Sequence, residues 1–226
     1  LAQQRAHAAL KASDPVMVRN AIMFLSGSRY SLDGGHDHRP DETMQTIAKL
    51  GRNADPKLLT AVRDYVPIPR ALANYGPAAR KHIDVVLDAA KQQPHADFYS
   101  DLAEIGGEKA MAFMVDSLPK LRADLDRLGV ALDATSDDLD KAESRKALVE
   151  YRVCRWGIER WAGRTFDTED ALSTWWQASR GKTQRQWLEE NLDRTAGEAD
   201  AGNAKAQYII RQVLPDLPHA SDDRPF

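Results

Sequence analysis

The densest set of ligand-type side chains lies in the segment DGGHDHRPDE, at residues 33–42. Imidazole and carboxylate groups this close together could bind zinc or another divalent ion. His36, Asp37 and His38 are therefore candidate metal ligands. The alternative, which the glycines favour, is a solvated loop, because ligating imidazoles need fixed orientation and outer-shell partners. A ligand or an activity would be expected in this loop first, since long loops on rigid scaffolds carry function.

Other chemistry-bearing patterns are missing from the sequence. It has no G-x-S-x-G motif, no Walker glycine loop and no G-x-G-x-x-G after a strand. Cys154 is the only cysteine, which excludes an internal disulfide or a cysteine-based zinc site, and its helical surroundings predict a buried thiol. We predict no catalytic residue and no cofactor, and interpret the chain as non-enzymatic.

The composition of the 226 residues is that of a globular protein, with 42% apolar and 29% charged residues. A net charge of −3 gives no global attraction to nucleic acid or to an anionic membrane. No apolar run approaches the roughly 20 residues that a membrane span needs. The chain opens at Leu1, which suggests processing or trimming, so exported and cytoplasmic locations are both allowed.

The elements that would position any site are helices. Helix-favouring residues fill the intervals between glycines and prolines, and no sustained strand alternation occurs. The fold class is therefore all-α. A first helix pair is predicted at 2–12 and 15–26, with Asp14 as N-cap and a helical period through Val16, Arg19, Ile22 and Met23.

A pattern of helix, glycine and second helix then recurs. Gly51, Gly76 and Gly106 follow short apolar helices and are 25 and 30 residues apart. The two prolines of PIPR, at 67–70, predict that Val66 ends one unit and that Pro69 starts the next. Spacings of this size indicate stacked helix pairs.

The units ALANYGPAARKHIDVVLDA and LAEIGGEKAMAFMVDSL resemble HEAT-type repeats, especially the short bacterial kind. The resemblance covers about residues 41–121 and implies an α-solenoid of antiparallel helix pairs that binds or scaffolds other molecules. The first helix pair lacks the leucine–glycine stop, so it is interpreted as a cap.

Beyond Gly129 the sequence predicts a polar linker and then a long helix at 141–162. Ser136, Asp137 or Asp138, at the end of the linker, could be the N-cap of this helix. Shorter helices are predicted at 169–179, 183–192 and 199–214. Thr168 is a predicted N-cap, and Thr183 with Gln186 fits a capping box.

Three of the five tryptophans lie in TEDALSTWWQASRGKTQRQWLEEN, at 168–191. This region resembles the C-terminal segment of bacterial HEAT-like proteins, in which an aromatic helix and a W..WW pair of short helices follow one another. It implies a module that closes the last repeat, because a solenoid exposes the apolar face of its terminal unit. The alternative is a basic aromatic surface for single-stranded nucleic acid, with ten Lys or Arg against six Asp or Glu between Lys141 and Trp187.

The predicted organisation is a cap (1–27), a loop (28–40), HEAT-like repeats (41–129), a linker (130–140), a closing module (141–214) and a tail (215–226). The predicted function is a protein-binding or scaffolding module, with Arg63, Lys81 and Lys109 as candidates on its recognition face. The alternatives are a ligand- or metal-binding accessory protein that uses the 33–42 loop, and the less favoured nucleic-acid binder. A protein partner is expected; a small-molecule ligand is left open.

Overall fold

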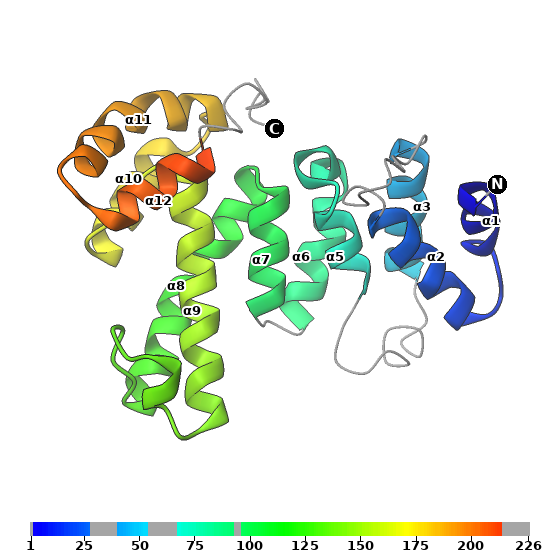
Figure 1. The fold of residues 1–226 in the computed structure, drawn as a ribbon, viewed down its shortest axis with the longest axis horizontal. Coiled ribbons are helices and arrows are strands. Elements are labelled where there is room, and N and C mark those ends of the chain that lie inside the picture. The colour runs from blue at the N-terminus through cyan, green and yellow to red at the C-terminus, as the bar shows by residue number, and fades with distance from the viewer. Residues whose placement is uncertain (1, 28–39, 54–66, 93–95, 214–226) are drawn as a thin grey trace. The chain divides into compact units, whose positions relative to one another are not determined.

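The computed structural model describes residues 2–27, 40–53, 67–92 and 96–213. These residues form eleven α-helices and two short 3-10 helices, with no strand among them, which confirms the all-α class (Figure 1). The chain divides into two compact units, Leu1–Ile105 and Gly106–Phe226, called here the N-terminal and C-terminal units. Each is described by itself.

The N-terminal unit is centred on the short helix α5, whose side chains are almost all buried. Helix α5 packs against α2, α3, α6 and α7, and Ile68, Leu72 and their alanine neighbours fill the space between them. A helix that is apolar all round is stable only when it is covered on every side. The elements of this unit are α1 (Ala2–Ala9), α2 (Pro15–Gly27), α3 (Pro40–Asn53), α5 (Pro67–Ala73), the 3-10 helix η2 (Gly76–His82), α6 (Ile83–Gln92) and α7 (Ala96–Ile105).

The predicted stops in this unit are partly correct. Gly106 has φ of 64° and directly follows α7, as predicted, whereas α5 already ends at Ala73 and Gly76, with φ of 57°, begins the 3-10 helix η2. Gly51 does not end α3, which continues to Asn53 although a glycine within a helix costs about 1 kcal/mol. The second helix predicted after Gly51 lies outside the described residues.

Helix α5 begins at Pro67, two residues before the predicted start at Pro69. Both prolines fit into the first turn, where backbone N–H groups have no partner within the helix. The helix predicted after Gly76 begins as the 3-10 helix η2 before it becomes α6 at Ile83. The predicted start of this helix is thus shifted by two residues, and the predicted end of the preceding unit at Val66 lies outside the described residues.

The C-terminal unit is built on a long antiparallel pair, α8 (Glu108–Leu128) and α9 (Ala142–Ala162), which lie side by side (Figure 1). Both helices end at a glycine in the left-handed conformation, Gly129 and Gly163, as predicted. Three further helices complete the unit: α10 (Glu169–Ser179), α11 (Gln184–Asp200) and α12 (Ala204–Val213).

The predicted caps of α10 and α11 are confirmed. The Thr168 hydroxyl accepts a hydrogen bond from Ala171 N at 3.1 Å, and Thr183 forms a capping box with Gln186. The prediction for the linker was wrong in one respect: Ser136–Asp138 form their own 3-10 turn, and the N-cap of α9 is Lys141.

Helix α11 is longer than the predicted range 183–192, and α12 accordingly starts at Ala204. Two buried polar side chains join α11 to the end of α9, and one of them, Thr195, lies in the extension. Asn191 Nδ2 donates to Ala162 O at 2.8 Å, and Thr195 Oγ1 donates to Gly163 O at 2.8 Å. Because these carbonyl groups at the end of α9 lack helical partners, α11 provides the hydrogen bonds that they need.

Candidate functional site

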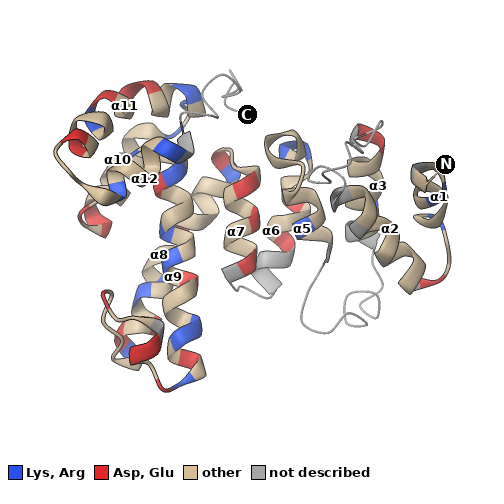
Figure 2. Ribbon diagram, viewed as in Figure 1, with Lys and Arg blue, Asp and Glu red and all other residues tan. Residues whose placement is uncertain are grey.

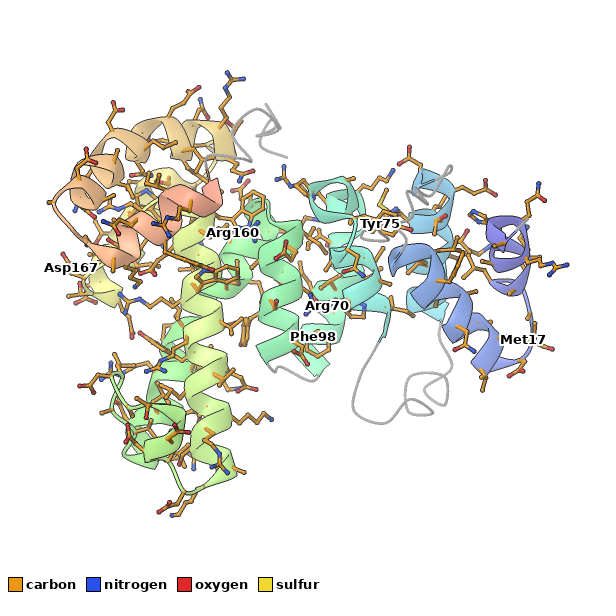
Figure 3. All side chains as sticks on the ribbon, viewed as in Figure 1. Met17, Arg70, Tyr75, Phe98, Arg160 and Asp167 are labelled. Carbon is orange, nitrogen blue, oxygen red and sulfur yellow. The ribbon has the colours of Figure 1, made fainter. Side chains whose placement is uncertain are left out.

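The outer face of helix α2 exposes large apolar side chains. Val16, Met17 and Phe24 are 61%, 49% and 48% exposed, and Figure 3 labels Met17 on the first turn of the helix. With 3.6 residues per turn, these three side chains and the exposed Asn20 share one side of the helix. Among the described residues only Val149 and Tyr208 are other large hydrophobics with comparable exposure. A cluster of this kind is typical of a contact surface.

The opposite face of α2 holds the helix in place. Val18, Ala21, Ile22 and Leu25 are buried, and the helix packs against α1 and α5. At its end, Tyr75 Oη donates a hydrogen bond to Leu25 O at 3.3 Å.

The predicted N-cap of α2 is confirmed as well, because Asp14 Oδ1 accepts from Val16 N at 2.9 Å. The helix is therefore anchored at both ends. The outer face, called here the α2 face, is defined by Val16, Met17, Asn20 and Phe24.

The apolar residues of this face are visible in the sequence, but the predicted helical period did not place them together on one exposed side. The prediction grouped Val16 with Ile22 on one apolar side, whereas Val16 points outward and Ile22 is buried. The buried set follows the spacing i, i+3, i+4, i+7, which begins at Val18. Val16, Met17 and Phe24 remain as apolar residues beyond what the core uses.

Two of the three basic residues predicted for a recognition face, Lys81 and Lys109, lie in different units of the described chain. Lys81 forms an ion pair with Asp41, and its hydrogen bond and charge lower the pKa of that carboxyl group. Lys109 is exposed on α8, in the other unit. Arg63 lies outside the described residues, so a recognition face made of these three side chains stays a prediction.

The candidate metal ligands His36, Asp37 and His38 also lie outside the described residues. Within the described ranges, no group of three or more His, Cys, Asp or Glu side chains could hold a metal ion. The metal-binding alternative therefore stays a prediction about residues 33–42.

The tryptophans of the C-terminal unit are mainly core residues. Trp161, Trp176 and Trp187 are buried, and Trp156 and Trp175 are partly buried. Phe166, Trp175, Trp176 and Trp187 form one cluster with ring-centroid distances of 5.3–6.3 Å. The Trp187 indole donates to Ser179 O at 2.9 Å, so its polar edge is satisfied within the core.

This burial removes most of the surface that a single-strand binder would use, because stacking on bases requires an exposed ring face. The arginines near the rings have partners inside the protein. Arg164 lies 4.7 Å from the Phe166 ring centroid, and Arg180 lies 5.7 Å from that of Trp176. Along α9, moreover, Lys and Arg residues are interleaved with Glu (Figure 2).

A buried carboxylate on α9 joins three elements of the C-terminal unit. Glu159 is 1% exposed, and its Oε1 accepts hydrogen bonds from Arg155 Nε at 3.2 Å and from Phe166 N at 3.2 Å. Lys205, from α12, lies with its Nζ 2.7 Å from Oε2. Sequence reasoning missed this ion-pair network, because only the spacing of Arg155 and Glu159 is visible before folding.

The network extends through a tyrosine. Arg155 donates to Tyr151 Oη at 3.2 Å, and Tyr151 donates to Glu169 Oε1 on α10 at 2.7 Å. Burial and the hydrogen bond to Glu169 raise the pKa of Tyr151. All these polar groups have partners within the protein, which indicates a structural network.

Among the described residues of the N-terminal unit, Asp101 is the carboxyl group with the most strongly raised pKa. Asp101 on α7 is 2% exposed, and its Oδ1 lies 3.0 Å from Nε of Arg70 on α5, which Figure 3 labels. Burial raises the pKa of Asp101 to about 7, more than the nearby guanidinium lowers it, and the charges of Asp97 and Glu104 add to the rise.

We expect this carboxyl group to make the N-terminal unit less stable as the pH rises. The folded-state pKa is above the unfolded value, so the stabilisation is complete below about pH 4 and is lost as the pH passes through 7. Between pH 5 and pH 8 the free energy of unfolding should fall by about 2 kcal/mol. Urea unfolding of wild type and Asp101→Asn, followed by circular dichroism at both pH values, tests this. The difference between the two proteins should change with pH by that amount; an unchanged difference would contradict the assignment.

Cys154 is fully buried, as predicted, and burial raises the pKa of its thiol, which donates to Met114 O at 3.3 Å.

No family model matches the chain, and no curated protein or solved structure is significantly similar to it. None of the helices in the described ranges has the length and apolarity that crossing a membrane requires.

Proposed function

We propose that this chain is a non-enzymatic protein-binding or scaffolding module that uses the α2 face as a contact surface. The observation that carries the proposal is the exposure of Val16, Met17 and Phe24 on a helix whose other side is fixed in the core. Leaving apolar side chains of this size in water lowers stability, and burying them in an interface recovers about 1.5–3 kcal/mol for each side chain that becomes fully covered.

The occupant proposed for this face is an amphipathic α-helix of a partner protein. The exposed side chains span two turns of α2, from Val16 to Phe24, and form a ridge one helix wide. A second helix packs on such a ridge through its own residues at i, i+3, i+4 and i+7. Inside the protein, α2 packs against α1 and α5 by the same type of contact.

The helical-repeat architecture belongs to the same proposal. We propose that the helices are HEAT-like pairs and that the tryptophan-containing segment closes their stack. The left-handed glycines after α5 and α7 support the first part, because they allow sharp turns between successive helices. The buried aromatic cluster of α10 and α11 supports the second, because large rings cover much apolar surface with few residues.

A photo-cross-linking residue at position 17 tests the contact surface. In extract from the native source, we expect the full chain with the probe at Met17 to form a covalent complex, and the chain with the probe at the exposed Tyr208 of α12 to form none. The partner is then purified and its affinity measured by calorimetry. Phe24→Asp should weaken binding by at least about tenfold, since it places a charge in an apolar interface.

Tyr208→Asp is the matched control, because this side chain is 46% exposed, close to the value for Phe24. It should bind like wild type, and both variants should have the circular dichroism spectrum of the wild type. Equal binding by wild type and Phe24→Asp would overturn the proposal.

A further inference from the structure

The α2 face has one polar residue, which lies in the middle of the apolar side chains. Val16, Asn20 and Phe24 follow one another at a spacing of four residues, so they form a ridge along the helix, with Met17 beside it. Asn20 is exposed, and its amide group carries both hydrogen-bond donors and an acceptor. A helix that covers this ridge removes the amide from water, which is costly unless the amide finds new partners.

The group that best pairs with the Asn20 amide is a second carboxamide. Two carboxamides can each donate one N–H to the oxygen of the other, whereas a carboxylate only accepts hydrogen bonds and an ammonium group only donates them. The hydrocarbon region of a membrane offers neither donors nor acceptors, so Asn20 also disfavours burial of this face in lipid. The residue opposite Asn20 is therefore expected to be an asparagine or a glutamine.

The α2 face of another copy of the chain supplies this residue together with the apolar side chains. If two α2 helices cross in antiparallel directions at a two-fold axis beside Asn20, the axis places Asn20 opposite Asn20. Val16 of each copy, four residues before Asn20, then faces Phe24 of the other copy, four residues after it. None of the side chains that define the face is charged, so no like charges meet within it. A two-fold contact requires this kind of self-complementary surface.

We propose that the α2 face pairs with the α2 face of a second copy, with the two Asn20 side chains at the two-fold axis. This inference rests on the proposed function, whose partner helix it identifies as α2 of another chain. The face is one helix wide and about 12 Å long, from Val16 to Phe24. The contact therefore belongs among small interfaces, below about 1,200 Å², and we expect a weak dimer with a dissociation constant on the order of 10–100 µM.

Sedimentation equilibrium of the purified full chain, from about 1 µM to about 1 mM, tests the inference. We expect the average mass to rise with concentration from that of one chain towards that of two. Phe24→Asp should weaken the dimer at least about tenfold, because it places a charge in the apolar contact of both copies. Tyr208→Asp should dimerise like wild type, and circular dichroism should show that both variants are folded.

A charge exchange at position 20 tests the two-fold axis. Asn20→Asp and Asn20→Lys should each be monomeric alone, because like charges would meet at the axis. An equimolar mixture of the two variants should form a dimer again, since only a contact of position 20 with position 20 brings the opposite charges together. If wild type dimerises and the mixture does not, the proposed pairing is overturned.

The remaining outcomes separate this inference from the proposed function. If the purified chain stays monomeric and the probe at Met17 captures a different protein in extract, the second copy is overturned and the contact surface stands. A monomer whose probe captures nothing overturns both. A dimer that Phe24→Asp leaves intact overturns the pairing through α2. Sedimentation with phosphatidylcholine–phosphatidylserine vesicles is the membrane arm, and vesicle binding that Phe24→Asp abolishes would overturn both, because lipid would then cover the face.

Discussion

Replacing Gly106 with alanine should lower the free energy of unfolding of the C-terminal unit by about 3 kcal/mol. Two effects add at this position. Gly106 has φ of +64°, a conformation that costs an L-residue about 1 kcal/mol or more. A Cβ atom there would also lie 1.7 Å from Cζ2 of Trp161 and 2.1 Å from two further ring atoms, so the buried indole would have to move.

Gly129→Ala separates the two effects. Gly129 has the same φ of +64°, but a Cβ atom there would meet nothing within 4 Å, so only the backbone cost of about 1 kcal/mol remains. Gly163→Ala should fall between them, because its Cβ would lie 2.7 Å from a single methyl group of Leu188. Equal losses for Gly106→Ala and Gly129→Ala would show that the indole does not occupy the described position.

The measurement for these variants is chemical unfolding followed by tryptophan fluorescence. All five tryptophans lie in the C-terminal unit, so the signal reports on that unit, whereas circular dichroism reports on both. Phe24→Asp and Asp101→Asn change the N-terminal unit and provide the reverse check. Neither should change the intrinsic fluorescence of the folded protein.

Replacing Glu159 with alanine should destabilise the C-terminal unit by about 3 kcal/mol. The substitution leaves Arg155, which is 16% exposed, without its closest counter-charge, and leaves the Phe166 N–H without its acceptor. Removing one partner of a buried ion pair is more costly than the pair itself is worth, because the remaining charge stays desolvated. Glu159→Gln should lose less, since an amide oxygen can still accept a hydrogen bond from Phe166 N.

The control is Glu189→Ala, which removes an ion pair of the same i, i+4 type. Arg185 and Glu189 are 51% and 59% exposed and 2.9 Å apart, so water replaces the lost interaction and the cost should not exceed about 0.5 kcal/mol. If Glu159→Ala costs no more than this control, Glu159 is not the buried centre of the network. A hydrogen-exchange measurement would then show no loss of protection in α12, which Lys205 ties to that centre.

The local structure of this protein could be read from the sequence alone. The helical class, the stops at Gly106, Gly129 and Gly163, and the caps at Asp14, Thr168 and Thr183 all agree with the structure. These features depend on residues within one helical turn of each other, so their energetics are present in any short segment. The burial of Cys154 followed from the same local pattern.

Contacts between distant residues were decided by the tertiary structure. The outward position of Val16, the continuation of α11 to Asp200 and the burial of Glu159 each depend on which neighbour covers a given face. Within the extension of α11, Thr195 donates a hydrogen bond to Gly163 O, 32 positions away in sequence. The sequence determined most helix starts and the stops at Gly106, Gly129 and Gly163, but not the end of α11. Which apolar and charged side chains stay exposed was decided only by the packing of the helices, because burial is a property of the assembled elements.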